Sequence, residues 1–485
     1  MRLTDLLSDL PAAAGDARIT GFAIDHRKVA PGTVFGAFRG TRFNGEDFIS
    51  QAIADGAIAI VSAPGPAVSG AVHVTDLEPR RAFARFAAKF FAPFPENTVA
   101  VTGTNGKTST VELTRQLWRM AGFHAASIGT LGVTTADDQV STGLTTPDIV
   151  TFLSNMAGLQ REGVTHAAFE ASSHGLSQFR TEGLPVRAVA FTNLSRDHLD
   201  YHGTMEAYFA AKLRLFTEVV DQGGAAVVWA DDPHSADVVK AVRARGVQLL
   251  SVGSQGETIR LLERTPTALG QSLKIEIEGK SRELKLPLIG AYQAANSLVA
   301  AGLVIATGGA IDLTLSNLQR VAPVRGRLER AAITKTGAPV YVDYAHTPDA
   351  LEAAIAALRP HTAGRLIVVF GAGGDRDSGK RPQMGKVAVE QADVAIVTDD
   401  NPRGEDPAEI RRAILAGAPG AHEVGDRRSA IIAAVAQAGK DDIVLIAGKG
   451  HEQGQIIGRG DAMRVLPFDD VTVAREAISG EGIGQ

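Results

Sequence analysis

A short glycine-rich segment at residues 102–109 constrains this chain more than any other feature. It has the sequence TGTNGKTS, follows the apolar, β-branched run 98–101 and leads into a helical pattern. Glycines let backbone N–H groups converge on phosphate oxygens, and a helix start and a lysine add positive charge. A threonine hydroxyl after the lysine can reach Mg²⁺. The residues predicted to bind a nucleoside triphosphate are Gly103, Thr104, Asn105, Gly106, Lys107, Thr108 and Ser109.

The segment is a shorter variant of the general P-loop. Val101 stands where the pattern G-x-x-x-x-G-K-[ST] has its first glycine. Glycine-rich turns from strand to helix also occur in ordinary α/β connections that bind nothing. Gly-Lys-Thr directly after a strand favours nucleotide binding over that alternative.

Composition sets the scale of the fold and excludes several classes of function. A chain of 485 residues with 45% hydrophobic content predicts about three globular domains. The net charge of -5 and the absence of a basic run argue against a nucleic-acid partner. The sequence has no cysteine, which excludes disulfides, thiolate metal sites and cysteine nucleophiles.

Neither hydrophobic candidate segment predicts a membrane or secretory protein. Residues 1–14 are interrupted by Asp5, Asp9 and Pro11, so they lack the apolar core of a signal peptide. Residues 286–311 are uncharged but contain Pro287, Gln293, Asn296 and several glycines with alanines between them, which is too weakly apolar for a membrane span and predicts a buried helix. We therefore expect a cytoplasmic protein that does not insert into a membrane.

The sequence predicts three domains, at residues 1–88, 89–324 and 325–485. In the first, expected strands at 34–38 and 57–61 flank an expected helix at 48–54, which indicates a small α/β domain. Pro93 and Pro95 mark a linker before the glycine-rich segment.

In the second domain, three apolar runs lead directly into polar residues. Runs 99–101, 167–169 and 188–191 precede the glycine-rich segment, residues 170–174 and residues 192–198. Strands alternating with helices predict a parallel sheet, in which ligands bind beyond the carboxyl ends of the strands. We therefore expect these three polar loops to meet at one edge of the sheet.

The third domain repeats this pattern. Expected strands at 366–370, 394–397 and 443–446 lead into residues 371–376, 400–403 and 448–452, which predicts a second parallel sheet with its own polar edge. The first of these loops does not complete G-x-G-x-x-G, because Arg376 occupies the last glycine position. A nicotinamide cofactor is therefore not expected.

Several polar residues leave alternatives open when they are considered alone. Glu170 suits a magnesium ligand or a solvated carboxylate at a strand end. The run 197–202, DHLDYH, fits a metal site and a polar turn equally well. Ser172 and Ser173 lack the G-x-S-x-G context of a serine hydrolase, and Gln455 replaces the second histidine of a zinc protease.

Together these motifs resemble the Mur ligase family, the ATP-dependent amino-acid-adding enzymes of peptidoglycan precursor synthesis. The resemblance extends over nearly the whole chain. It implies an α/β, three-domain architecture with a central P-loop-like parallel sheet and a C-terminal Rossmann-like domain. The segments that carry it are 103–108, 170–174, 192–202, Asn296, 326–329 (GRLE), 343–348 (DYAHTP) and the loops after residue 370.

Within the family, the chain is similar to the members that add meso-diaminopimelate to UDP-N-acetylmuramoyl-L-alanyl-D-glutamate. This similarity implies that ATP phosphorylates the D-glutamyl γ-carboxylate and that an amine then attacks the acyl phosphate. The catalytic residues implied are Lys107, Lys212, His198 and Glu170. The magnesium ligands implied are Thr108, Glu170, His198 and a carbamylated Lys212. From the sequence alone, Lys212 is a helix lysine, and such residues usually lie on a solvated face.

The resemblance also implies three binding sets. ATP would contact residues 103–109 together with Asn296, Arg327, Asp343 and His346. The muramyl dipeptide would contact Ile24, His26, Thr41, Arg42, Phe43, Thr145, Thr146, Ser172, Gln178 and Arg180. Diaminopimelate would contact Arg376, Asp400, Asn401, Pro402, Arg403, Gly448 and Glu452, unless Arg403 pairs with Glu405 or Asp406.

The chain departs from the family pattern at three positions. His26 stands where the family usually has serine, and Trp229 and Gln293 stand where it usually has asparagine. These differences affect the expected uridine and adenine contacts. Two other functions are alternatives: a folylpolyglutamate synthetase, which uses the same acyl-phosphate chemistry, and a nucleotide-dependent switch. The N-terminal domain ahead of the phosphate loop and the loop 400–403 argue against the synthetase. The switch is disfavoured because no Asn-Lys-x-Asp motif is present. We expect a monomer.

Overall fold

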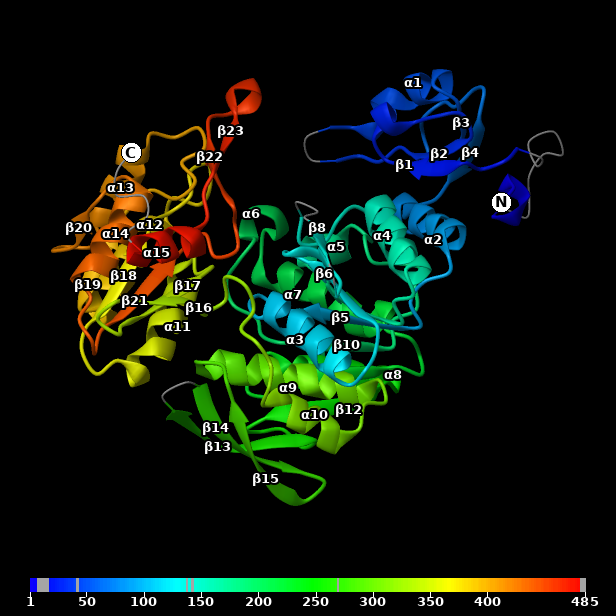
Figure 1. The fold of residues 1–485 in the computed structure, drawn as a ribbon. Helices are drawn as coiled ribbons and strands as arrows, with labels where there is room; N and C mark the ends of the chain where they lie inside the picture. Colours follow the sequence, from blue (N-terminus) through cyan, green and yellow to red (C-terminus); the bar gives the residue numbers. More distant parts are fainter. Residues whose placement is uncertain (7–16, 41–42, 137, 141–143, 268–269, 480–485) are drawn as a thin grey trace. The chain divides into compact units, whose positions relative to one another are not determined.

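The computed structural model describes residues 1–6, 17–40, 43–136, 138–140, 144–267 and 270–479 (Figure 1). It is an α/β protein built on parallel sheets, as predicted. The chain divides into two compact units, Met1–Thr258 with Val299–Thr314, and Ile259–Leu298 with Leu315–Gln485. Within the described ranges, no helix has both the length and the apolar character needed to cross a membrane. The domain boundaries expected at 88 and 324 stay a prediction.

The first unit begins with a small parallel sheet. Its strands, in spatial order, are β1 (Gly21–Ala23), β2 (Thr33–Gly36), β3 (Ala57–Ser62) and β4 (Val72–Thr75). Helix α1 (Ile49–Ala54) packs on β3, and α2 (Pro79–Phe91) follows the sheet. The predicted strands and helix are confirmed, except that β2 ends at Gly36 rather than Phe38.

A larger sheet forms the rest of the first unit. Its spatial order is β12 (Gln248–Gly253), β11 (Ala225–Trp229), β10 (Ala188–Phe191), β5 (Asn97–Thr102), β9 (His166–Glu170), β6 (Ala125–Gly129), β7 (Gly132–Thr134) and β8 (Gln139–Val140). The strands from β12 to β6 run parallel, and β7 and β8 are antiparallel. After β5 the chain continues first toward β6 and later returns to β10 on the other side. Such a reversal places a ligand site at the carboxyl end of β5.

Helices connect these strands, and α4 (Ile149–Arg161), α5 (Ser173–Ser177) and α7 (Met205–Arg214) begin at polar side-chain caps. Asp148 accepts from the backbone N–H of Val150 and Thr151, and Thr204 accepts from Ala207. These caps satisfy N–H groups that have no partner within the helix. The helices are α3 (Lys107–Met120), α4, α5, α6 (Leu199–His202), α7, the π-helical turn Leu215–Val219, and α8 (Ser235–Arg245).

The second unit begins with an antiparallel meander of β13 (Ile259–Thr267), β14 (Gly270–Ile277) and β15 (Lys280–Leu286). Helices α9 (Ala291–Ala306) and α10 (Ile311–Leu318) follow along the chain, and their stretch Val299–Thr314 belongs to the first unit. The buried helix predicted over 286–311 is therefore wrong at both ends. Leu286 still belongs to β15, and Gly308, with φ of +92°, lies beyond the helix end in a conformation that favours glycine.

A second mostly parallel sheet carries the C-terminal part. Its spatial order is β16 (Glu329–Ile333), β17 (Pro339–Asp343), β21 (Ile443–Ala447), β18 (Leu366–Phe370), β19 (Val394–Val397) and β20 (His422–Glu423), with only β16 antiparallel among these described strands. The three predicted strands are confirmed here.

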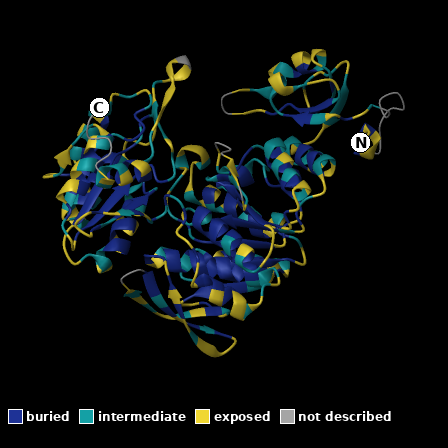
Figure 2. Ribbon diagram, in the orientation of Figure 1, coloured by how far each residue is buried: buried dark blue, intermediate teal, exposed yellow. Residues whose placement is uncertain are grey.

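Helices cover both faces of this sheet (Figure 1). Leu366, Val368 and Phe370 pack with α11 (Pro348–Leu358), α12 (Lys380–Gln391) and α13 (Pro407–Leu415). Ile367 and Val369 point to the other face, against α14 (Arg427–Gln437) and α15 (Asp470–Ser479). Burial on both faces explains the unbroken apolar run of β18, and Figure 2 shows the central strands as buried. A hairpin of β22 (Gly454–Ile457) and β23 (Arg464–Pro467) extends from this part.

Candidate active site

The glycine-rich segment joins β5 to α3 as predicted. Gly106 has φ of +84° and caps α3, a backbone conformation that a side chain would strain. A Cβ on Gly103 would collide with the Thr192 hydroxyl. The Lys107 ammonium donates to the carbonyl oxygens of Gly103 at 3.0 Å and Thr104 at 2.9 Å. Lys107 therefore lies over the loop that is predicted to hold the triphosphate.

The loop after β10 fixes the shape of the glycine-rich segment. The Asn105 N–H donates to Asn193 Oδ1 at 2.9 Å, and the Thr104 N–H donates to the Asn193 carbonyl at 2.9 Å. Thr192 Oγ1 donates to the Asn105 carbonyl at 2.6 Å. Two of the loops predicted to share an edge are thus hydrogen-bonded to each other. Asn193 was not among the predicted site residues.

Glu170 ends β9 with its side chain buried, which excludes the solvated alternative. Only 2% of the residue is exposed. Its Oε1 accepts from the Thr130 N–H at 2.7 Å, and its Oε2 accepts from the Thr130 hydroxyl at 3.3 Å. A carboxylate held this way beside a phosphate loop suits a divalent cation.

Lys212 is buried on α7, so the solvated-face interpretation is wrong for it. The residue is 1% exposed, and its Nζ donates to the Gly103 carbonyl at 2.7 Å, the same oxygen that Lys107 contacts. Its Nζ also lies 4.3 Å from the ring centroid of Tyr208. Burial, with the nearby charge of Lys107, holds the pKa of Lys212 well below its usual value. The structure thus brings a second, readily deprotonated amine to the phosphate loop.

His198 lies at the start of α6 within a cluster of aromatic rings. Its ring centroid is 4.8 Å from that of His174 and 6.1 Å from that of Tyr208. Burial lowers the pKa of His198, and the carboxylate of Asp197 partly opposes this effect. In the described residues, no three His, Cys, Asp or Glu side chains group as a metal site. The choice between metal ligand and polar turn for this run stays a prediction.

Residues from three loops meet beside Glu170. Thr146 Oγ1 donates to the Glu170 carbonyl at 2.9 Å and accepts from the Ser172 N–H at 3.1 Å. Arg180 donates to the Thr146 carbonyl at 2.9 Å and to Gln178 Oε1. The hydroxyl oxygens of Thr145 and Thr130 lie 3.1 Å apart. The predicted dipeptide-binding residues of this domain are therefore brought together.

The remaining nucleotide-sugar residues lie in the segments that follow β1 and β2 of the N-terminal sheet or outside the described residues. The ring of His26 stacks on that of Phe48 at 4.1 Å between centroids, and the side chain of Phe43 is 76% exposed. Ile24 is half-buried just after β1. Thr41 and Arg42 fall outside the described ranges.

The second unit groups its own nucleotide-binding candidates around Asp343. Asp343 accepts from the N–H groups of Leu328 at 2.7 Å and Ala345 at 2.9 Å. Its pKa rises to about 6 through burial, although Arg327 opposes the shift. Arg327 lies over the Tyr344 ring, and His346 Nδ1 lies 2.7 Å from the Tyr344 carbonyl. Asn296 is buried on α9. That these residues join the phosphate loop in one ATP site stays a prediction.

The edge of the C-terminal sheet collects the predicted amino-acid-binding residues. Asn401 Nδ2 donates to Glu452 Oε2 at 2.8 Å, and the Gly374 N–H donates to the Asn401 carbonyl at 2.9 Å. Gly448 follows β21 with φ of +122°, and a Cβ there would meet the Asp400 carboxylate. Asp400 and Pro402 are buried, and Arg376 is exposed. The three predicted loops of this edge are thus confirmed as neighbours.

Arg403 has a backbone conformation that is unusual for arginine, with φ of +51°. Its Nη1 donates to the Gly374 carbonyl at 3.0 Å. Burial and the neighbouring charge of Arg376 lower its pKa. Glu405 pairs with Arg381 at 2.9 Å, and Asp406 caps α13. The expected alternative, in which Arg403 neutralises those carboxylates, is therefore wrong.

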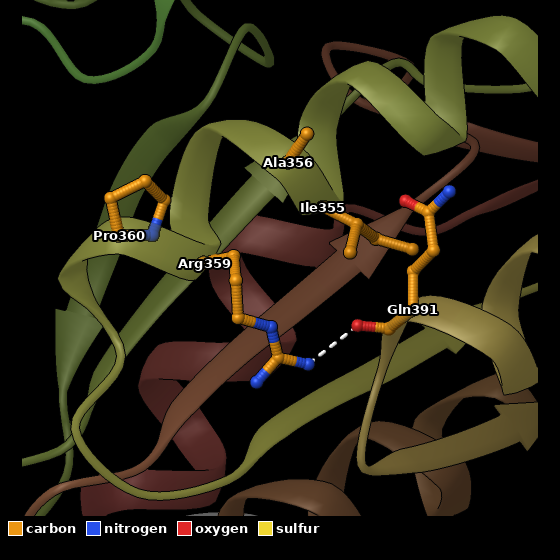
Figure 3. A pocket seen from close by; sticks show the side chains of 5 residues that line it. All are labelled: Ile355, Ala356, Arg359, Pro360 and Gln391. Carbon is orange, nitrogen blue, oxygen red and sulfur yellow. Dashed lines mark hydrogen bonds between the residues drawn. The ribbon is translucent and has the colours of Figure 1, made fainter.

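A surface pocket lies on another part of the second unit. It is lined by Ile355 and Ala356 of α11, Arg359, Pro360, and Gln391 at the end of α12 (Figure 3). Arg359 crosses it to the Gln391 carbonyl and also pairs with Asp393 at 2.7 Å. None of the predicted site residues lines this pocket.

Family profiles match three successive parts of the chain. They are described as "Mur ligase family, catalytic domain" over residues 18–90, "Mur ligase middle domain" over 101–304, and "Mur ligase, glutamate ligase domain" over 326–450.

Relatives that match over nearly the whole chain are also named as ligases. A Zymomonas mobilis protein named "UDP-N-acetylmuramoyl-L-alanyl-D-glutamate--2,6-diaminopimelate ligase" is 62% identical over 96% of this chain and 95% of its own length. A solved structure with that enzyme name has 32% identity and a TM-score of 0.74 over 99% of both chains. A Mycobacterium tuberculosis folylpolyglutamate synthase has 19% identity and a TM-score of 0.61 over 74% of this chain and 89% of its own, a similarity of fold alone.

Proposed function

The chain belongs to the Mur ligase family, and we propose that it joins meso-diaminopimelate to UDP-N-acetylmuramoyl-L-alanyl-D-glutamate in an ATP-dependent, ADP-forming reaction. A full-length relative with 62% identity bears the name of this activity. The structural observation that carries the proposal is the edge of the central sheet, where Lys107 and Lys212 contact the phosphate loop and Glu170 ends β9, the strand that pairs with β5.

The reaction needs activation because a carboxylate is a poor electrophile. Attack of the D-glutamyl γ-carboxylate on the γ-phosphorus of ATP forms an acyl phosphate and releases ADP. The neutral amine of diaminopimelate then attacks the carbonyl carbon, loses a proton and expels inorganic phosphate. Both reactants of the first step are anions, so positive charge is needed to offset their repulsion. Lys107 supplies a fixed charge at the loop.

Thr108, Glu170 and His198 fit a magnesium ion bound with ATP. Glu170 is an ionisable oxygen donor held by Thr130, and burial lowers the pKa of His198, which favours the unprotonated ring that a metal ion needs. When bound, the ion neutralises charge on the triphosphate.

Lys212 fits the carbamylation implied by the family. Carbamylation requires an unprotonated amine, and burial lowers the pKa of Lys212. The modification would convert an amine beside the phosphate loop into an anion that can orient a cation. Lys212 contacts the loop carbonyl of Gly103 directly, which supports a role in the site rather than on the surface.

The amino-acid site suits a ligand with both charges at its far end. Arg403 and Arg376 provide positive charge for a carboxylate, and Glu452 and Asp400 provide negative charge for an ammonium. Meso-diaminopimelate differs from lysine by that far carboxylate. Lysine would leave the guanidinium of Arg403 without an anion, so it is a poor substrate.

We further propose that the enzyme is a cytoplasmic monomer in peptidoglycan precursor synthesis, the process behind cell-wall growth, shape and division. Its three domains are residues 1–88 for the nucleotide sugar, 89–324 for ATP and 325–485 for the amino acid. The three successive family profiles support this division.

An assay with the purified protein tests the proposed function. ADP release is measured with ATP, Mg²⁺, the muramyl dipeptide and either meso-diaminopimelate or lysine, and the product is identified by mass spectrometry. The proposal expects a muramyl tripeptide with diaminopimelate only. Turnover with a folate and glutamate would instead support a folylpolyglutamate synthetase, and ATP hydrolysis without an acceptor would support a switch.

A further inference from the structure

Lys449 is a charged residue with a completely buried side chain at the edge of the C-terminal sheet. Its side chain is 0% exposed and follows β21 by two residues. Its Nζ donates to Asn401 Oδ1 at 2.7 Å and lies 3.5 Å from Glu452 Oε2 and 3.8 Å from Asp400 Oδ1. A buried ammonium is costly unless it is well paired, so this position requires its partners.

Lys449 and the Ile456 N–H together set how the Asn401 carboxamide is oriented. Asn401 Oδ1 accepts from the Lys449 ammonium and from the Ile456 N–H at 3.0 Å. Both partners can only donate, so the carboxamide oxygen must face them. Asn401 Nδ2 must then face Glu452, to which it donates at 2.8 Å. The ammonium thus positions Glu452 directly and also through Asn401.

This arrangement leaves one oxygen of Glu452 open for a ligand. Its Oε2 is engaged by Asn401 and Lys449, whereas Oε1 has no hydrogen bond to any described residue. The side chain is 30% exposed. Lys449 offsets part of the negative charge of Asp400 and Glu452, and the second carboxylate oxygen of Glu452 stays available to an ammonium group.

A neighbouring buried ion pair stabilises the backbone of the same edge. Arg427 pairs with Asp470 at 2.7 Å, and its guanidinium also donates to the carbonyls of Ala447 at 3.0 Å and Asp399 at 3.4 Å. These carbonyls precede Gly448 and Asp400. Arg427 therefore stabilises the main chain before Gly448 and Asp400. Lys449, in contrast, contacts the polar side chains of Asn401 and Glu452.

We propose that Lys449 is a positioning residue that orients Glu452, directly and through Asn401, to receive the far ammonium group of the incoming amino acid. The inference rests on the proposed function, because it assigns the ligand as a diamino acid. Lys449 does not touch the substrate in this assignment. It acts through Glu452.

The test compares steady-state constants of Lys449→Met, Glu452→Gln and the double variant. Lys449→Met should raise the KM for meso-diaminopimelate at least about tenfold and change the KM for ATP less than about twofold. The effects of the two substitutions should not multiply, because the lysine acts through the glutamate. Lys386→Met is the matched control, since Lys386 is an exposed lysine of α12 whose ion pair within the described part of the chain is with Glu390.

Three outcomes overturn the inference: an unchanged KM for diaminopimelate, equal rises in both KM values, or effects that multiply in the double variant. If Lys449→Met does not fold, the double variant, which also removes the carboxylate charge of Glu452, becomes the deciding measurement. Its KM should equal that of Glu452→Gln alone, and a higher KM contradicts the inference. Failure of the unmutated protein to form the tripeptide would instead refute the proposed function.

Discussion

Arg403 offers the sharpest prediction about amino-acid selection. Its guanidinium is half-buried beside Arg376 and bonded only to a carbonyl oxygen among the contacts described, at 3.0 Å. Its φ of +51° is a conformation that glycine adopts without strain. We therefore compare Arg403→Ala with Arg403→Gly. Both remove the guanidinium, and only the second relieves the backbone.

The expected rise in KM follows from the number of hydrogen bonds that the guanidinium would make to the substrate carboxylate. Charge-assisted hydrogen bonds contribute about 1.5–3 kcal/mol each. Loss of a two-bond grip on a carboxylate, partly replaced by water and by Arg376, should cost about 3 kcal/mol, or roughly a hundredfold in KM for diaminopimelate. Removal of one of two neighbouring positive charges should leave the melting temperature unchanged or higher. The glycine variant should be the more stable of the two, by about 1 kcal/mol.

The assay is ADP release at varied meso-diaminopimelate, with ATP and the muramyl dipeptide saturating. Arg428→Ala is the matched control, since Arg428 is a half-exposed arginine of α14 that pairs with Glu476. Both Arg403 variants should show the same rise in KM, whereas the control should not. An unaltered KM for diaminopimelate, or a rise in the alanine variant alone, would show that the guanidinium does not bind the far carboxylate.

Three further predictions concern the nucleotide site. Lys107→Ala should abolish ligation while circular dichroism stays unchanged, because a charge is lost from the phosphate loop; near-normal turnover would place phosphoryl transfer elsewhere. Lys212→Ala should be inactive and partly restored by short carboxylic acids, and a well-resolved crystal structure of active enzyme with an unmodified Lys212 would contradict the role. Asp343 has its pKa raised to about 6, so the folded protein binds this proton more tightly than the unfolded chain does, and stability falls as pH rises from about 4 to 6. Across this range, the free energy of unfolding of Asp343→Asn, measured by denaturant titration, should rise relative to that of the unmutated protein by up to about 3 kcal/mol. If the unfolding free energies of the two proteins change in parallel with pH, the raised pKa is refuted.

The sequence was sufficient to predict both polar edges. Each rests on apolar runs followed at once by polar residues, and the parallel arrangement of strands brings such loops together. Thr130 was missed although it obeys the same rule. It follows β6, whose run Ala125–Gly129 was not recognised as a strand because alanine, serine and glycine make its apolar character weak.

Other site residues could not be predicted from local pattern. Lys449 and Asn401 are 48 positions apart and meet only because β19 and β21 end at the same edge. The burial of Lys212 depends on how α7 packs against the phosphate loop, so its sequence neighbours gave no sign of it. The error at the start of α9 has a similar origin, since the strand pairing of β15 places Leu286 outside the helix.

Transfer of an oxygen atom tests the central claim most directly. The muramyl dipeptide is prepared with ¹⁸O in the D-glutamyl γ-carboxylate and incubated with the enzyme, ATP, Mg²⁺ and meso-diaminopimelate. Activation through an acyl phosphate predicts that each inorganic phosphate released carries one ¹⁸O atom for each tripeptide formed. Tripeptide formation accompanied by unlabelled phosphate would contradict the mechanism, because the carboxylate oxygen would not have become the leaving group.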